Sequence, residues 1–78
     1  MRILSVVAVG RLAERFVRKA DDQPMPVADL VALLTNYDVA DDRARAGVQL
    51  SVIVGRLEGT TDSEGRACVQ LPEAREAA

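Results

Sequence analysis

The residues of this chain that could take part in catalysis are mainly carboxylates. Aspartates stand side by side at Asp21 and Asp22 and again at Asp41 and Asp42, and two carboxylates can divide general acid and general base work. The chain has no histidine, so the Ser-His and Cys-His arrangements that activate a nucleophile are absent. Both aspartate pairs fall at predicted helix boundaries, where capping of backbone N–H groups accounts for them. The sequence therefore predicts a protein without a catalytic site.

Ligands for a metal ion or a cofactor are equally scarce. One thiol, that of Cys68, cannot assemble a metal site without histidine, and the five glycines never take the spacing of a phosphate-binding loop. Cys68 falls in a predicted strand, where we expect a small, half-buried apolar side chain. The aromatic residues are Phe16 and Tyr37, which leaves no platform for stacking nucleic-acid bases. We expect neither a metal nor a cofactor.

The elements that must position these residues begin with a helix over residues 3–20. Apolar residues recur there at helical spacing, while arginines gather on another face. The start of this helix is open, because residues 3–9 are rich in β-branched side chains and also suit a strand that ends at Gly10. Pro24 and Pro26 then end the helix, since proline removes a backbone donor and disfavours helical geometry in the residue before it.

A second helix is predicted over residues 27–35, and a third follows the turn at residues 36–38. Asp41 or Asp42 is expected to cap the third helix, and Gly55 stands where its C-terminal cap belongs. Residues 48–57 also fit strand alternation, so this segment stays open between helix and strand, with the helix favoured. Gly47 costs about 1 kcal/mol relative to alanine inside a helix, which either weakens the helix prediction or marks a close contact.

A β-hairpin is predicted at the end of the domain. Residues 56–61 and 66–71 form two runs around the turn at residues 62–65, which ends in glycine. Pro72 closes the second strand, and residues 73–78 are expected to form a flexible tail. The length of the chain allows a single domain, which we assign to residues 1–72. The predicted fold class is therefore α+β, with three helices and a C-terminal hairpin.

Residues 26–71 resemble the winged helix-turn-helix domains of bacterial transcription regulators, with residues 3–20 as the first of the three helices. The stretch reads PVADLVALLTNYDVADDRARAGVQLSVIVGRLEGTTDSEGRACVQL. The resemblance implies a DNA-binding regulatory protein of a small bacterial or phage type, which occupies double-stranded DNA without catalysis. In that family the second of the paired helices enters the major groove, and the hairpin, or wing, touches the flanking backbone. The residues that the resemblance places against DNA are Arg43, Arg45 and Gln49 on the third helix and Arg56 and Arg66 beside the wing.

The charge of the chain supports a competing prediction. The net charge is −2, and acidic residues stand at the start of the supposed recognition helix, Asp41 and Asp42, and at the tip of the wing, Asp62 and Glu64. Acidic groups at these places disfavour a polyanionic partner. The alternative is a protein-interaction module on the same scaffold, which would hold an acidic or apolar partner with the winged-helix surface or with the basic first helix.

The apolar segments bear on location and assembly. The charge-free stretch of residues 3–10 is far shorter than the ~20 residues that span a bilayer, and a single cysteine closes no intramolecular disulfide. We therefore expect a cytoplasmic protein with no membrane partner. The apolar start of the first helix exceeds what one small domain can cover, and it predicts a homodimer with Ile3, Val6 and Val9 at the interface.

Overall fold

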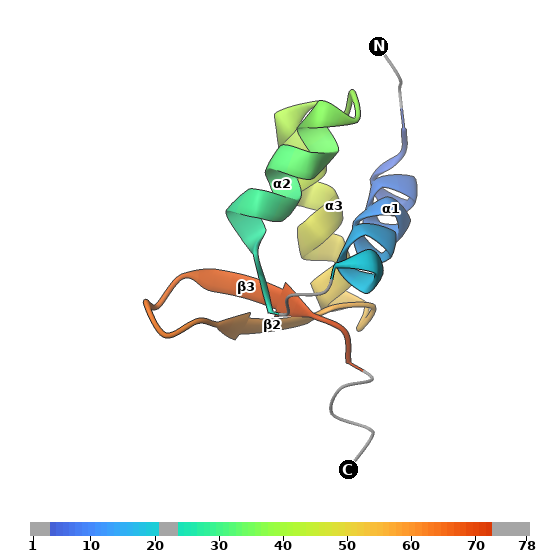
Figure 1. The fold of residues 1–78 in the computed structure, drawn as a ribbon. Helices are drawn as coiled ribbons and strands as arrows, with labels where there is room; N and C mark the ends of the chain where they lie inside the picture. The colour runs from blue at the N-terminus through green and yellow to red at the C-terminus, as the bar shows by residue number, and fades with distance from the viewer. Residues whose placement is uncertain (1–3, 21–23, 73–78) are drawn as a thin grey trace.

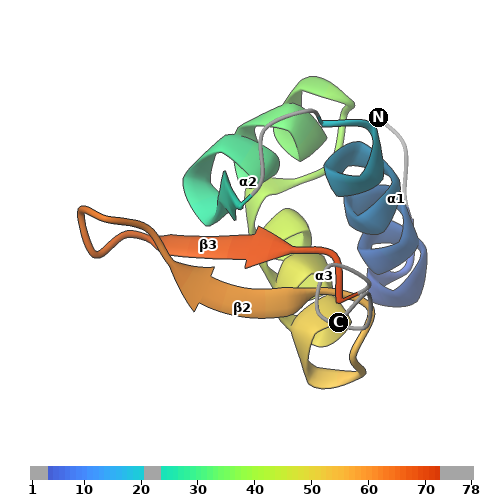
Figure 2. The same ribbon diagram turned by 60° about the horizontal axis from the view of Figure 1, so that its bottom comes forward.

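The computed structural model describes residues 4–20 and 24–72. These residues form three helices and a three-stranded antiparallel sheet, so the predicted α+β fold class is confirmed (Figure 1). The elements are α1 (Val6–Lys19), β1 (Met25–Pro26), α2 (Val27–Asn36), α3 (Asp41–Ile53), β2 (Glu58–Thr61) and β3 (Ala67–Gln70). The strand order is β1-β3-β2, and the β2–β3 hairpin projects from the helices (Figure 2). This arrangement is consistent with the layout of a winged helix.

Helix α1 begins at Val6 because Ser5 caps it. The Ser5 Oγ accepts a hydrogen bond from the backbone N–H of Ala8 at 3.1 Å, which satisfies one of the unpaired donors of the first turn. From Val6 onward the strand alternative for residues 3–9 is therefore wrong. The buried face of the helix includes Val9, Ala13 and Val17, each of them 0% exposed.

A short strand, β1, follows the predicted proline break. Met25 pairs with Val69 of β3 and Pro26 pairs with Cys68, in antiparallel register. Proline has no N–H to donate, and it is tolerated here because β1 is an edge strand of the sheet. This strand was not predicted from the sequence, since two residues are too short to show an alternating pattern. Residues 21–23, which include one of the aspartate pairs, lie outside the described residues.

The turn between α2 and α3 has the predicted chemistry, but the cap of α3 differs. Asp38 adopts a φ of 66°, a left-handed conformation that aspartate tolerates better than most residues. The N-cap of α3 is Ala40, so neither Asp41 nor Asp42 is the N-cap residue that we expected, but the Asp42 Oδ1 accepts a hydrogen bond from the Arg43 backbone N–H of the first turn at 2.9 Å. Both aspartates lie inside the first turn instead, where the helix dipole favours negative charge.

The C-terminal end of α3 settles the open segment. Residues 48–53 are helical, so the strand alternative for them is wrong. Val54 is the C-cap, and Gly55 follows with a φ of 85°, which glycine adopts without the steric cost of a Cβ atom. The predicted role of Gly55 at the end of this helix is confirmed.

Helices α1 and α3 pack closely because each has a glycine where they meet. A Cβ atom on Gly47 would lie 2.8 Å from the Cβ of Val9, which is closer than real Cβ contacts allow. Across the same contact the buried Ser51 Oγ donates a hydrogen bond to the carbonyl oxygen of Gly10 at 2.9 Å. Of the two interpretations of Gly47, a weaker helix prediction or a close contact, the structure supports the close contact.

The hairpin forms as predicted, with strands shorter than expected. Cα partners run from Glu58 opposite Gln70 to Thr61 opposite Ala67. In the turn, Gly65 has a φ of 79°, and its backbone N–H donates to the carbonyl of Asp62 at 3.0 Å. Residues 73–78, the predicted tail, lie outside the described residues.

The core between the helices and the sheet is aliphatic, as the composition requires. Cys68 belongs to it as a free thiol that is 2% exposed, so it is buried more deeply than the half-buried side chain expected. None of the described helices is long and apolar enough to cross a membrane. The largest side chains that are almost fully buried are those of Leu30, Leu34, Leu57, Val9, Val17 and Val69.

Candidate interaction surface between α3 and the hairpin

Helix α3 presents two different faces. Its buried residues are Ala44, Gly47, Val48 and Ser51, which recur at helical spacing toward α1 and α2. On the opposite side an exposed stripe follows the spacing i, i+3, i+7 and i+11. Residues at these intervals lie above one another along a helix, so their side chains form one surface. The stripe consists of Asp42, Arg45, Gln49 and Ile53.

A groove of about 730 Å³ separates this side of α3 from the hairpin. Arg45 and Gln49, two of the predicted site residues, line it one helical turn apart. The rest of the lining is largely apolar or small. On the helix side it includes Val48, Val52 and Ile53, and on the hairpin side Gly59, Thr61, Ala67 and Val69.

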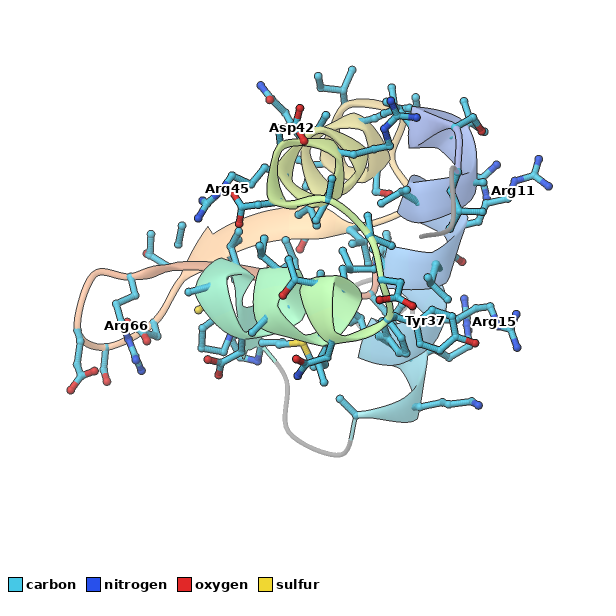
Figure 3. The ribbon with its side chains drawn as sticks, turned by 90° about the horizontal axis from the view of Figure 1, so that it is seen from above. Arg11, Arg15, Tyr37, Asp42, Arg45 and Arg66 are labelled. Atoms are coloured by element: carbon cyan, nitrogen blue, oxygen red, sulfur yellow. The ribbon has the colours of Figure 1, made fainter. Side chains whose placement is uncertain are left out.

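The two arginines of this surface are already paired within the chain. The Arg45 Nε lies 2.9 Å from an Asp41 carboxylate oxygen, one helical turn before it. At the hairpin turn the Arg66 Nε lies 2.7 Å from Asp62, and its Nη2 lies 3.2 Å from Glu64. Figure 3 shows Arg45 on α3 and Arg66 at the turn of the hairpin. Neither guanidinium is therefore free of a carboxylate partner.

Carboxylates outnumber guanidinium groups at the start of α3 and at the hairpin turn taken together. The acids are Asp41, Asp42, Asp62 and Glu64, against Arg43, Arg45 and Arg66. The pKa of Asp62 lies below its ordinary value, mainly because the Arg66 backbone N–H donates to it, with further hydrogen bonds from the Arg66 guanidinium and the Glu64 N–H. The surface is consequently acidic at neutral pH.

The other two predicted arginines lie away from the groove. The Arg43 Nη1 donates to the carbonyl oxygen of Leu4 at 2.6 Å, just before α1 begins. Residues two apart on a helix point in nearly opposite directions, so the expectation that Arg43 shares one surface with Arg45 is wrong. Arg56 Nη1 lies 3.4 Å from Glu14 of α1. The structure therefore brings Arg45 and Gln49 together at the groove, whereas Arg66 lies at the hairpin turn outside its lining and Arg43 and Arg56 face α1.

Sequence reasoning missed Ile53 as a residue of this surface. Its side chain is 72% exposed, the highest value among the exposed large apolar residues of the described chain, and it lines the groove. Val54, beside it, is 57% exposed. The available signal was the interval of four residues from Gln49 to Ile53, which places both on one face once the segment is taken as a helix.

The residues predicted for the dimer interface differ in their exposure. Val9 is fully buried against Gly47, so it is unavailable to a partner and its assignment to a dimer interface is wrong. Val6 is half-buried, and Ile3 lies outside the described residues. Val7 is instead 53% exposed, and it lines a second pocket of about 320 Å³ together with Leu50 and Val54.

The basic face of α1 lies on the far side of the molecule from the hairpin. Arg11 and Arg15 point to solvent there, as Figure 3 shows. Between them on the helix, Glu14 pairs with Arg18 at 3.1 Å, and this hydrogen bond is the main reason that the pKa of Glu14 lies below its ordinary value. The acidic groove surface and the basic α1 face are thus separate parts of the surface.

Comparisons with protein-family models, curated proteins and solved structures find no match to this chain. Within the described residues no group of three or more histidine, cysteine or acidic side chains is placed to hold a metal ion.

Proposed function

We propose that this chain is a protein-interaction module and that a partner protein docks in the groove between α3 and the hairpin. The observation that carries the proposal is Ile53, a large apolar side chain that is 72% exposed at the wall of an apolar groove. Exposed apolar surface rimmed by polar groups is typical of protein interfaces. Complete burial of an isoleucine side chain contributes about 1.5–3 kcal/mol, so Ile53 would supply a useful part of a binding free energy.

The charges of the same surface also favour a protein partner. Each arginine that could meet a phosphate, Arg45 and Arg66, is within 3.0 Å of a carboxylate of its own surface. A polyanion would have to replace these carboxylates and approach a surface of net negative charge. A partner with apolar and basic side chains meets no such repulsion. The buried free thiol of Cys68 suits a reducing compartment, and we place the protein in the cytoplasm.

DNA binding by the same surface is the second candidate. The observation that favours it is the layout: paired helices α2 and α3 followed by a hairpin, with Arg45 and Gln49 on the exposed stripe of α3. Exposed ion pairs contribute only about 0–1 kcal/mol, so phosphates can compete for these arginines. With Arg45 and Arg66 as its two phosphate ligands, such a protein would show a slope of about −1.8 for log K against log salt concentration.

A photo-crosslinking amino acid at position 49 separates the two candidates. Gln49 is exposed in the groove wall, and Lys19 at the end of α1 offers an exposed control position away from it. In cells that naturally contain this chain, we expect a protease-sensitive adduct from position 49 but not from position 19. Ile53→Asp should abolish that adduct. A nuclease-sensitive adduct that is lost in Arg45→Glu would replace protein docking with DNA binding.

A salt titration with random duplex DNA provides the second measurement. The full chain should show no salt-dependent affinity if the groove is a protein site. The proposal would be contradicted by an affinity for DNA that falls with salt concentration at a slope of about −1.8. In that case Arg45→Glu should remove the DNA affinity, and Ile53→Asp should leave it unchanged. Both variants change exposed residues, so the free energy of unfolding serves as a common control.

A further inference from the structure

The outer edge of β2 is open. In the sheet order β1-β3-β2, strand β2 has a hydrogen-bonded neighbour on one side only. At the other edge of the sheet, Pro26 of β1 lacks an N–H and α2 begins at the next residue. Strand β2 contains neither proline nor lysine, and its pairing with β3 runs without a bulge from Glu58 to Thr61. Of the devices that keep an edge from pairing, β2 therefore has its short length and the charge of Glu58, but neither a proline nor a bulge.

The register of the hairpin identifies which backbone groups are open. The N–H of Asp62 donates to the carbonyl of Arg66, so this residue pair is hydrogen-bonded across the ladder. Hydrogen-bonded pairs alternate along antiparallel strands, which turns Thr60 and Glu58 toward β3 as well. The N–H and C=O groups of Gly59 and Thr61 consequently point away from β3. No other described segment gives either residue a backbone hydrogen bond.

We infer that a segment of the partner protein adds to the sheet as a strand along the open edge of β2, pairing with Gly59 and Thr61. This inference rests on the proposed docking function and specifies its mode. Both residues are exposed, and they also line the groove. A Cβ atom on Gly59 would point to the face of the sheet and meet the Val52 Cγ1 at 3.7 Å, which places this face of β2 against α3.

The side chains around the edge indicate the chemistry of that segment. Alternate residues of an added strand share the sheet face of Gly59, on the side of Val52 and the groove. Apolar side chains suit those positions. Glu58 and Asp62 flank the two open residues. Asp62 is bound by Arg66 and Glu58 accepts a hydrogen bond from Gln70, and basic side chains opposite them would share these carboxylates with the partners that they have in the chain. The fitting partner is an extended segment with alternating apolar residues between two lysines or arginines.

A second copy of this chain fits the same edge poorly. If β2 paired with β2 of another copy so that Gly59 met Thr61, Glu58 would stand directly opposite Asp62 of that copy. Like charges that face each other across a ladder are destabilising. The charges therefore favour a basic partner strand over self-pairing.

The probe is a short peptide, Lys-Val-Thr-Val-Lys, acetylated at one end and amidated at the other. Bound along β2, its valines would lie opposite Gly59 and Thr61. We expect amide exchange at these two residues to slow when millimolar peptide is added to the full chain. N-methylation of both valines removes the N–H groups that would donate to the Gly59 and Thr61 carbonyls, and the methyl groups would then stand between the two strands, so this peptide should give no protection. Glu-Val-Thr-Val-Glu should protect less than the lysine peptide. Equal protection by the N-methylated peptide, or none by the first, would overturn strand addition.

One variant links this mode to the docking function. Thr61→Pro removes an N–H that points away from β3, so the hydrogen bonds between β2 and β3 keep their donors. Because the lost N–H would pair with the added strand, the protein adduct from position 49 should be lost. If that adduct persists in a folded Thr61→Pro chain, docking stands and strand addition is wrong. If the parent chain gives no protein adduct, the docking function itself fails. Slow exchange at Gly59 that depends on protein concentration alone would assign the edge to self-pairing and overturn the inference.

Discussion

Replacing Gly47 by alanine should destabilise the protein at the contact between α1 and α3. The new Cβ atom would lie 2.8 Å from the Cβ of Val9 and 3.1 Å from the backbone nitrogen of Gly10, and it would also meet the Val9 Cγ1. A rotation of the Val9 side chain moves Cγ1 but neither of the other two atoms, because they belong to or adjoin the backbone. The two helices must therefore move apart.

Two effects of opposite sign decide the magnitude. Alanine is favoured over glycine inside a helix by about 1 kcal/mol. Overpacking of a well-packed contact costs about 1–3 kcal/mol, and the fixed position of the Val9 Cβ places this site toward the upper end. The net loss in the free energy of unfolding is then about 1–2 kcal/mol. In a chain of this size such a loss lowers Tm by roughly 4–16 °C.

Urea unfolding followed by circular dichroism measures this loss directly. Ala32→Gly, at an exposed position in the middle of α2, reports the propensity effect and should cost up to about 1 kcal/mol. The double variant with Val9→Ala and Gly47→Ala should lose less than the sum of the single changes, because the first removes one of the clashing atoms. A Gly47→Ala chain that is more stable than the parent by about 1 kcal/mol would show that propensity alone governs the site and would refute the close contact.

Three further expectations follow from the described contacts. The pKa of Asp62 is lowered in the folded state, so its carboxylate stabilises the hairpin turn fully above pH 3.8, the ordinary pKa of aspartate, and this stabilisation is lost as the pH falls below that value. Amide exchange at Glu64, whose N–H donates to Asp62, should speed up over the same pH range, and Asp62→Asn should abolish this pH dependence. Ser51→Ala removes the hydrogen bond to the Gly10 carbonyl and should cost about 1 kcal/mol in urea unfolding, whereas an unchanged stability would deny that bond any weight. Val7 is exposed and is the apolar residue of α1 best placed to join a homodimer interface. Sedimentation equilibrium should therefore find a dimer that Val7→Asp dissociates, and a monomeric parent chain would end the dimer proposal.

Local signals in the sequence were sufficient for most of the elements. Pro24 and Pro26 marked the end of the first helix, Gly55 marked the end of the third, and the glycine of the turn at residues 62–65 marked the hairpin. Each signal works through the backbone of one or two residues, either by removing a donor or by adopting a positive φ. Such effects need no distant partner, so they can be recognised without a tertiary structure.

The tertiary structure decided which of these residues share a surface. The sequence places Arg43 and Arg45 together, but the packing of Ala44 and Val48 into the core turns one arginine toward Leu4 and the other toward the groove. Strand β1 likewise exists only because β3 lies beside it. Side-chain types and their spacing are properties of the chain, whereas the face that each helix buries depends on contacts between residues far apart in sequence. That dependence is why the apolar groove and the open edge of β2 emerged only from the fold.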